Sequence, residues 1–255
     1  MKKVLYLLLA GLMVLAIGAC ANNGENDEAN NTAMDTATET APTATTATTD
    51  TEAANDAVQL VNDAQGVAQQ MSADQNLVSL LKKAKGVYIV PHYGKGALVV
   101  GGQGGTGVML ANQNGQWSNP VFFDMGGISI GAQAGGEGGE IAMLLMTDKA
   151  VNAFKGENTF SLNADAGFTI VNYSAKAQGD LGKGDVIMWS STSGAFAGAQ
   201  VGATDINFDD NRNNSYYGAQ NTNTQQILQG QVTAPPTADQ LKQSLSGGSR
   251  TAAAA

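Results

Sequence analysis

The stretch from Ala84 to Ala134 constrains the fold of this chain more than any other, because short apolar runs alternate there with glycine, asparagine and proline. Five runs rich in β-branched residues follow one another, at residues 87–90, 97–100, 108–111, 121–123 and 128–130. Runs of this length bounded by turn-forming residues are typical of antiparallel strands joined by short connections. The stretch therefore predicts a sheet with glycine-rich turns and no helix.

Helices are predicted before this sheet. From Ala57 onward, apolar residues recur at helical spacing, which predicts a first helix. Ser72 and Gln75 form a capping-box pattern in front of an apolar run, which predicts a second helix that ends near Gly86. Glycine is frequent, at 32 residues, and suits a tightly turned β structure better than a helical bundle.

More elements are predicted after the sheet. Residues 141–146 form a continuous apolar run of strand length, which we expect to be buried on both faces. Thr147 or Asp148 is expected to cap a short helix through Phe154. Further strands are expected at residues 159–162, 167–171, 186–189 and 195–200, a short helix before Gly218, and a last helix from Thr237 to Leu245 with Gln240 completing a capping box. The fold class is therefore α+β, with an antiparallel, sandwich or barrel-like sheet flanked by helices at both chain ends.

The order of these motifs resembles the SYLF domain family. The resemblance is carried by residues 84–91, Val99-Val100-Gly101-Gly102 with Gly105 and Gly107, Trp117-Ser118-Asn119-Pro120, 127–135, 143–147 with Ala150 and Phe154, 193–198 and Tyr216-Tyr217-Gly218. This family is the lipid-binding domain of yeast and animal Src-homology-3 adaptor proteins, where it is also linked to actin, and it occurs alone in bacterial lipoproteins. The resemblance covers roughly residues 57–230 and implies a non-catalytic, lipid-binding domain without a cofactor.

The chain starts with the features of a signal peptide over residues 1–19. Two lysines are followed by an apolar segment that is shorter than the ~20 residues of a membrane-spanning helix, so we expect it to be cleaved. Ile17-Gly18-Ala19-Cys20 resembles the bacterial lipobox, which implies that Cys20, the only cysteine, is acylated with diacylglycerol and fatty acids such as palmitate. The alternative is a stray cysteine in a signal segment.

Localisation follows from the same segment. Ala21, rather than aspartate, follows the cysteine, which resembles the sorting signal for the outer membrane in a bacterium with two membranes. We therefore expect a lipid-anchored protein of the cell envelope, on the outer membrane and facing the periplasm. In such a place the actin link of the eukaryotic relatives is not expected to apply.

Residues 20–56 are expected to form a disordered tether between the anchor and the domain. They are rich in alanine and threonine, and residues 21–56 hold eight acids and no base. Without apolar side chains to bury, such a segment does not compensate for the entropy of ordering. The net charge of the chain is −9, which makes nucleic acid an unsuitable partner. Residues 231–255 are expected to be a C-terminal helix and a frayed tail.

A lysine cluster is the candidate binding site. Lys82, Lys83 and Lys85 follow the second predicted helix, and Lys95 lies one hairpin further on. Ammonium groups near an anionic membrane surface contribute up to ~1 kcal/mol each, so the cluster predicts binding of anionic lipid headgroups. The alternative is that these lysines complement the helix dipole and keep the surface soluble.

No catalytic or metal site is predicted. His92 is the only histidine, has no nucleophile motif beside it, and is expected to lie in an exposed turn. One histidine and one acylated cysteine do not make a zinc site. Residues 102–107 match G-x-G-x-x-G, but a strand rather than a helix is expected to follow, which favours a hairpin or bulge over a dinucleotide site. We expect the acid pairs, Glu137 with Glu140 and Asp209 with Asp210, to be solvated.

The sequence thus predicts a bacterial lipoprotein whose domain binds anionic membrane lipids and is not an enzyme. The alternative is an envelope scaffold that is placed on the membrane by its acyl chain alone and recognises an unknown envelope protein instead of a headgroup.

Overall fold

The computed structural model describes residues 44–95, 103–130, 139–156, 159–173, 184–191 and 201–247. All of these residues belong to one compact unit, Pro42–Ala255. The predicted signal peptide, Cys20, and the predicted strands at residues 97–100 and 195–200 lie outside the described residues.

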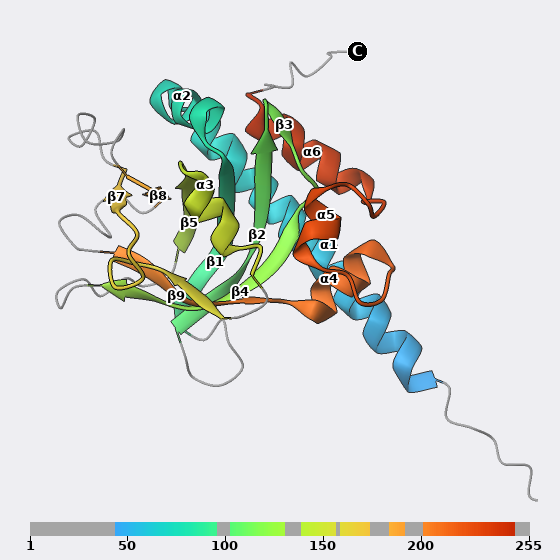
Figure 1. Cartoon of the computed structure of the whole chain (residues 1–255). Coiled ribbons are helices and arrows are strands. Elements are labelled where there is room, and N and C mark those ends of the chain that lie inside the picture. Colours follow the sequence, from blue (N-terminus) through green and yellow to red (C-terminus); the bar gives the residue numbers. More distant parts are fainter. Residues whose placement is uncertain are drawn as a thin grey trace, which may run out of the picture. The chain divides into compact units, whose positions relative to one another are not determined.

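The described strands form one mixed sheet that curves into a nearly closed barrel (Figure 1). The strands are β1 (Gly86–Lys95), β2 (Gln103–Gln113), β3 (Gln116–Trp117), β4 (Val121–Ile130), β5 (Gly139–Leu145), β6 (Phe160–Leu162), β7 (Ile170–Asn172), β8 (Val186–Ser190) and β9 (Val201–Phe208). Their order is β6-β9-β4-β2-β1-β5-β8-β7, with β3 paired to β2. Neighbours are antiparallel except β7 and β8, which are parallel. The α+β, barrel-like prediction is confirmed, although the sheet is not wholly antiparallel.

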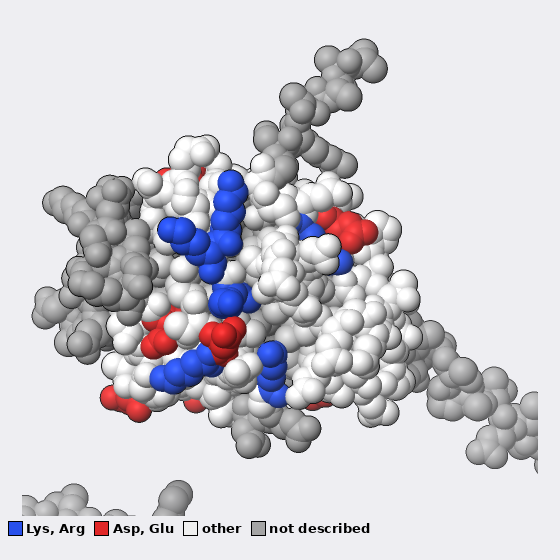
Figure 2. Space-filling view, turned by 45° about the horizontal axis from the view of Figure 1, so that its top comes forward, with Lys and Arg blue, Asp and Glu red and all other residues white. Residues whose placement is uncertain are grey.

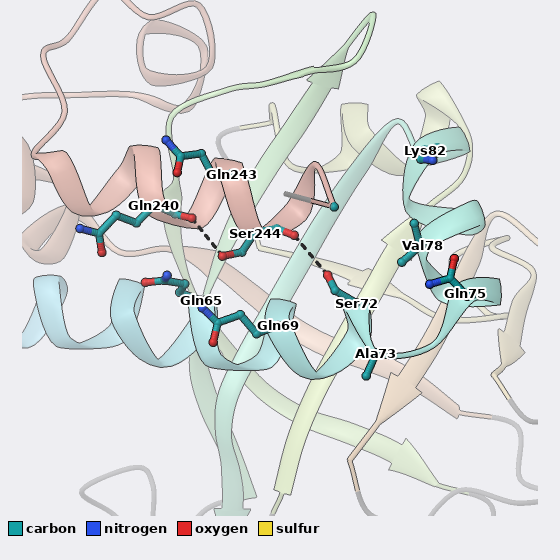
Figure 3. A pocket seen from close by; sticks show the side chains of 11 residues that line it. Gln65, Gln69, Ser72, Ala73, Gln75, Val78, Lys82, Gln240, Gln243 and Ser244 are labelled. Carbon is teal, nitrogen blue, oxygen red and sulfur yellow. Dashed lines mark hydrogen bonds between the residues drawn. The ribbon is translucent and has the colours of Figure 1, made fainter. Parts of the chain in front are cut away.

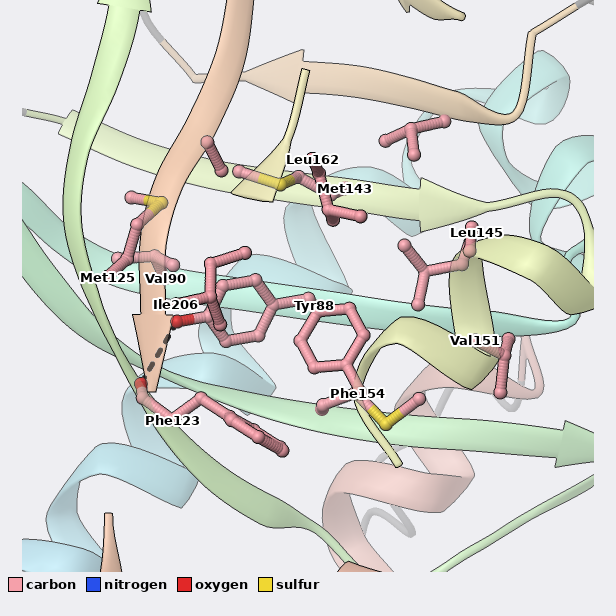
Figure 4. Close-up of a cluster of buried hydrophobic side chains, with 14 of the residues drawn as sticks. Tyr88, Val90, Phe123, Met125, Met143, Leu145, Val151, Phe154, Leu162 and Ile206 are labelled. Carbon is pink, nitrogen blue, oxygen red and sulfur yellow. Dashed lines mark hydrogen bonds between the residues drawn. The ribbon is translucent and has the colours of Figure 1, made fainter. Parts of the chain in front are cut away.

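Side chains alternate between two cores along each central strand, because successive residues of a strand point to opposite faces. In β1, Val87 and Ile89 face the helices, whereas Tyr88 and Val90 face the inside of the curved sheet. The inner core is aromatic: Tyr88 lies beside Phe123 and Phe154, and its hydroxyl donates to the Phe123 carbonyl oxygen at 3.0 Å (Figure 4). As predicted, β5 is buried on both faces.

Helices cover the outer face and one end of the sheet. They are α1 (Ala44–Ser72), α2 (Gln75–Lys83), α3 (Asp148–Ala153), α4 (Asp210–Tyr217), α5 (Thr224–Leu228) and α6 (Pro236–Leu245). The long helix α1 packs on the outer face, with α4 and α6 beside it (Figure 1). The helix α3, capped by Thr147 as predicted, inserts Phe154 into the inner core.

Three predicted helix starts are wrong. The helix α1 begins at Ala44 rather than Ala57, so residues 44–56 of the predicted disordered tether are helical. The N-cap of α2 is Asp74, whose carboxylate accepts from the Asn76 N–H at 2.8 Å, and Ser72 still belongs to α1. Pro235 precedes α6 without any side-chain cap, because proline at the first turn replaces the capping box that Gln240 suggested.

Three described elements, β3, β9 and α5, were not predicted, and two predicted strands are joined. Residues 201–208 form β9 although they are partly polar, since the strand pairs with β4 and β6 over most of its length. The short helix α5 has a capping box between Asn223 and Gln226 that sequence reasoning had not recognised. The strands expected at residues 121–123 and 128–130 are one continuous strand, β4.

The glycine motif of β2 is a packing feature. Gly105 and Gly107 lie against β1, and a Cβ atom on Gly107 would be 2.4 Å from the Ile89 carbonyl oxygen. The pairing of β1 with β2 shifts by one residue between Ile89 and Gly94, which is a β-bulge. The predicted hairpin or bulge is thus confirmed, and a strand follows instead of the helix that a dinucleotide site needs.

The Tyr-Tyr-Gly motif ends α4 as predicted. Tyr216 is buried and packs against Phe122, while the Tyr217 hydroxyl donates to the Pro120 carbonyl oxygen at 2.5 Å. Gly218 adopts a left-handed conformation with φ of 59°, which glycine reaches without strain. Upstream, the fully buried Asn213 donates to and accepts from the backbone of Phe122, so its side chain extends the hydrogen bonding of β4.

Candidate functional site

The predicted lysine cluster begins on the last turn of α2. Leu77 and Leu81 of this helix are buried, because residues four apart lie on the same face of a helix. Lys82 and Lys83 consequently point away from the core and are exposed. In the described part of the chain neither ammonium group forms an ion pair or a hydrogen bond. Both groups are therefore available to an anionic ligand.

Lys85 lies where α2 leads into β1. Its backbone N–H donates to the Leu145 carbonyl oxygen at 2.8 Å, and its own carbonyl oxygen accepts from the Asn112 N–H at 2.8 Å. These two bonds fix the backbone, whereas the side chain remains 53% exposed, with Nζ 4.0 Å from a carboxylate oxygen of the exposed Asp148. An exposed ion pair at this distance contributes little to stability, so the Lys85 ammonium group remains available to bind another anion.

Two further lysines, on and just after α3, extend the cluster. Asp148, the first residue of α3, lies 4.0 Å from Lys85 Nζ, which places the start of this helix beside Lys85. We call Lys82, Lys83, Lys85, Lys149 and Lys155 the basic row; Figure 2 shows several Lys and Arg side chains on one face of the molecule. Lys149 donates to the Gly167 carbonyl oxygen and lies 4.4 Å above the centre of the Phe168 ring, and Lys155 donates to Asn152. Sequence reasoning missed this pair because more than sixty residues separate it from α2.

Lys95 does not join the basic row. It is the last residue of the ten-residue strand β1, whereas Lys85 lies just before the first. At ~3.3 Å per residue, the two ends of this strand are about 30 Å apart, farther than one headgroup reaches. Its side chain lies outside the described residues. The part of Lys95 in headgroup binding therefore stays a prediction, and its backbone lies at the far end of β1 from the other three lysines.

His92 lies in strand β1 rather than in the predicted turn. It is exposed, and its Nε2 is 2.9 Å from a carboxylate oxygen of Asp63 in α1. Within the described residues, no serine or threonine hydroxyl is hydrogen bonded to His92, as an acyl-transfer site would need. The contact between His92 and Asp63 links α1 to strand β1 of the sheet. That the protein is not an enzyme remains a prediction.

One acid of each predicted pair, Glu140 and Asp209, has a structural role, whereas Glu137 lies outside the described residues. Glu140 accepts from Gln70 at 2.9 Å, and Asp209 caps α4 and binds Arg212 at 2.6 Å. Asp210 is exposed, as predicted, but Asp209 is buried. Among the described residues, no three histidine, cysteine or acidic side chains gather as metal ligands would.

The ionisable groups with shifted pKa values lie away from the basic row. Burial raises the pKa of Asp124, and the nearby charge of Asp209 adds to this effect, while a hydrogen bond from Thr106 opposes it. Burial also raises the pKa of Tyr216 to about 12. A hydrogen bond from the Tyr173 hydroxyl lowers the pKa of Asp74. These groups belong to different packed elements, and burial or a local hydrogen bond accounts for each shift.

Within the described ranges, no helix combines the length and the apolar character needed to cross a membrane.

Comparison with known proteins identifies a family match. A family model described as Ysc84, Las17-binding protein actin regulator, matches residues 126–247. This range begins inside β4 and ends just after α6, so the motifs of β1 and β2 lie before it.

Curated relatives extend the similarity. The chain is 31% identical over 180 residues to Protein YSC84 of Saccharomyces cerevisiae, which is 68% of this chain and 38% of the relative. Identity is 31% over 180 residues to LAS seventeen-binding protein 3 of the same yeast, covering 68% of this chain and 39% of that relative. The identity to the SH3 domain-containing YSC84-like protein 1 of Xenopus laevis is 30% over 175 residues, which cover 64% of this chain and 49% of that relative. The alignments thus span about two fifths to one half of these relatives.

Proposed function

This chain carries a domain of the Ysc84 (SYLF) family, a family described as actin regulators, and we propose that its own function is non-catalytic binding of anionic membrane lipids. The site is the basic row, with Lys82, Lys83 and Lys85 as the main contacts. In this proposal the acylated Cys20 anchors the protein to the outer membrane of a bacterium, and the domain faces the periplasm.

One observation carries the proposal: Lys82 and Lys83 are exposed on the same helical turn, and neither has a partner among the described residues. Lys149 and Lys242, in contrast, each donate to an oxygen atom of another residue. Val78 and Leu80 on α2 are partly exposed and offer a small apolar contact beside the ammonium groups. A charged and weakly apolar helix end of this kind suits a membrane surface.

The expected strength is modest. At ~1 kcal/mol for each lysine near an anionic surface, three lysines provide about 3 kcal/mol, which corresponds to roughly a hundredfold preference over a neutral surface. Because the charges are exposed, salt should weaken the binding. An affinity of this order is useful to a protein that an acyl chain already holds at the membrane, since the anchor raises its effective concentration there.

The test is flotation of the full chain with Cys20→Ser, which removes the proposed anchor, on vesicles of graded anionic content at two salt concentrations. We expect binding that needs anionic lipid and weakens with salt. The triple variant Lys82→Gln, Lys83→Gln, Lys85→Gln should bind at least tenfold less. The variant Lys82→Arg, Lys83→Arg should bind as the parent does, because it keeps the charges.

A charge-matched control separates local from overall electrostatics. Replacing the exposed Gln116, Gln220 and Gln229 by glutamate also lowers the net charge by three, but outside the basic row. This variant should bind nearly as the parent does. Equal binding by the lysine and the control variants would refute the site. If the parent binds no vesicle at all, lipid binding by the domain is refuted, and the envelope scaffold becomes the better description.

A further inference from the structure

A second surface of the domain, which shares only Lys82 with the basic row, has the features of a binding site. Three helices enclose a groove of about 690 Å³. Five glutamine side chains border it: Gln65 and Gln69 from α1, Gln75 from α2, and Gln240 and Gln243 from α6 (Figure 3). At its floor, Ser72 donates to the Ser244 carbonyl oxygen at 3.2 Å, which ties α1 to α6.

The five amides have unused hydrogen-bonding capacity. None of these side chains forms a hydrogen bond with another described residue. Other glutamines of α1 behave differently, since the amide of Gln59 donates to Asp63 at 2.8 Å and that of Gln70 donates to Glu140 at 2.9 Å. Each glutamine amide offers two N–H donors and one acceptor oxygen, so the groove presents donors and acceptors together.

The spacing of the amides matches an extended peptide. Gln65 and Gln69 are four residues apart on α1, a rise of ~6 Å along the helix. Gln240 and Ser244 have the same separation on α6. In an extended chain, peptide groups that face the same side recur every two residues, about 6.6 Å. Successive backbone amides of such a chain would therefore meet successive polar side chains on either wall.

The remaining lining restricts the ligand. No acidic and no aromatic residue lines the groove, and Val78 is its only large apolar side chain. A sugar ligand usually meets an aromatic ring, and an acyl chain needs an apolar channel; this groove has neither. Lys82 stands at the end formed by α2, so this end favours a carboxylate (Figure 3).

We propose that this groove binds a peptide segment in extended conformation. Small, uncharged side chains lie between α1 and α6, and a carboxylate, from an acidic residue or a chain terminus, lies at Lys82. The groove is ~10 Å long, as seven residues of helix are, and therefore accommodates about three residues of the peptide. This site is independent of the proposed lipid binding, apart from Lys82, which borders both.

The experiment uses the full chain with Cys20→Ser and pools of labelled hexapeptides of random Ala, Ser, Thr and Gly, ending in either Asp or Asn and amidated at the C-terminus; a third pool that ends in Asn with a free C-terminus tests the terminal carboxylate. Fluorescence polarisation measures affinity, and NMR of the glutamine NH₂ groups locates the ligand. We expect saturable binding, a preference for Asp over Asn, and shifts of the Gln65, Gln69 and Gln240 amide signals. Peptides with N-methylated backbones should lose at least tenfold in affinity, because methylation removes their N–H donors.

Variants separate the groove from general effects. Gln65→Met, Gln69→Met keeps side-chain length and helix propensity but removes the amides, and should weaken peptide binding at least tenfold. The control Gln70→Met, on the same helix but outside the groove, should not. Vesicle binding should be unchanged in both, which distinguishes this site from the lipid surface. Failure of every pool to bind, equal affinity for N-methylated peptides, or binding of a chitotetraose probe instead of peptide would overturn the proposal.

Discussion

At the scale of the residue, the partner of a side chain decides its role more than its type does. Lys149 is held by a carbonyl oxygen and an aromatic ring, and Lys242 bridges Asn119 and Asp239. Lys82 has no such partner in the described part of the chain. The three lysines look alike in the sequence, yet only the last keeps its full capacity for a ligand. The same contrast distinguishes Gln65 of the groove from Gln70, which is bound to Glu140.

Asp124 gives a prediction at this scale. Burial raises its pKa, so the folded state binds the proton more tightly than the unfolded state does. The resulting penalty is absent below the unfolded pKa of ~4, grows as pH rises towards the folded pKa, and is constant above it. We expect Asp124→Asn to be more stable than the parent at pH 7 and to lose this advantage at pH 3. Urea unfolding at both pH values is the measurement, and an Asn variant less stable than the parent at pH 7 would contradict it.

At the scale of the element, the same residue type has opposite effects in a helix and in a strand. Gly66 lies inside α1, where a Cβ atom would meet nothing within 4 Å. Gly107 lies in β2, where a Cβ atom would collide with the β1 backbone at 2.4 Å. Glycine weakens a helix that does not need it, but it is indispensable where two backbones approach closely.

Alanine scanning of these two glycines tests this difference. Gly107→Ala should destabilise the protein by about 2 to 3 kcal/mol, because the sheet must open locally to accept the methyl group. Gly66→Ala is the matched control and should stabilise it by about 0.5 to 1 kcal/mol. The measurement is the free energy of unfolding in urea for both variants and the parent. Gly107→Ala with unchanged stability would mean that β1 and β2 do not pair as described.

Sequence reasoning at this scale succeeded where the pattern is local. The strands β1, β2, β5 and β8 and the helices α3 and α4 were placed from their own residues, because apolar periodicity and caps are local signals. It failed for β9, which is a strand because β4 and β6 lie on either side of it. The capping box expected at Ser72 failed because this residue continues α1 and bonds to Ala68 and Ser244 instead.

At the scale of the whole molecule, α1 closes the outer core. Its buried residues are Ala57, Leu60, Val61, Ala64, Val67, Ala68 and Met71, whereas residues 51–56 are exposed or half-buried. The helix is thus longer than the surface it covers, because its first buried side chain among residues 51–72 is Ala57. The family resemblance proposed from residues 57–230 coincides with the packed part of this helix.

Truncation from the N-terminus tests how far α1 supports the domain. Removal of residues 1–50 should leave the melting temperature within a few degrees of the Cys20→Ser chain. Removal of residues 1–64 also deletes Leu60 and Val61, each worth about 1.5 to 3 kcal/mol of buried apolar surface, and should leave a poorly folded protein. Thermal unfolding followed by circular dichroism separates the two. A longer truncation that melted like the parent would show that α1 is not part of the core.

The sequence by itself determined the α+β class, the buried central strands and the family, because these depend on short-range patterns of apolar residues, glycines and caps. It also indicated the lysines at the end of α2. Only the tertiary structure decided that Lys95 lies at the far end of β1, that Lys149 and Lys155 extend the basic row, and that five glutamines from three helices border one groove. Such sets combine residues distant in the chain, and their proximity is fixed by strand pairing and helix packing rather than by local sequence.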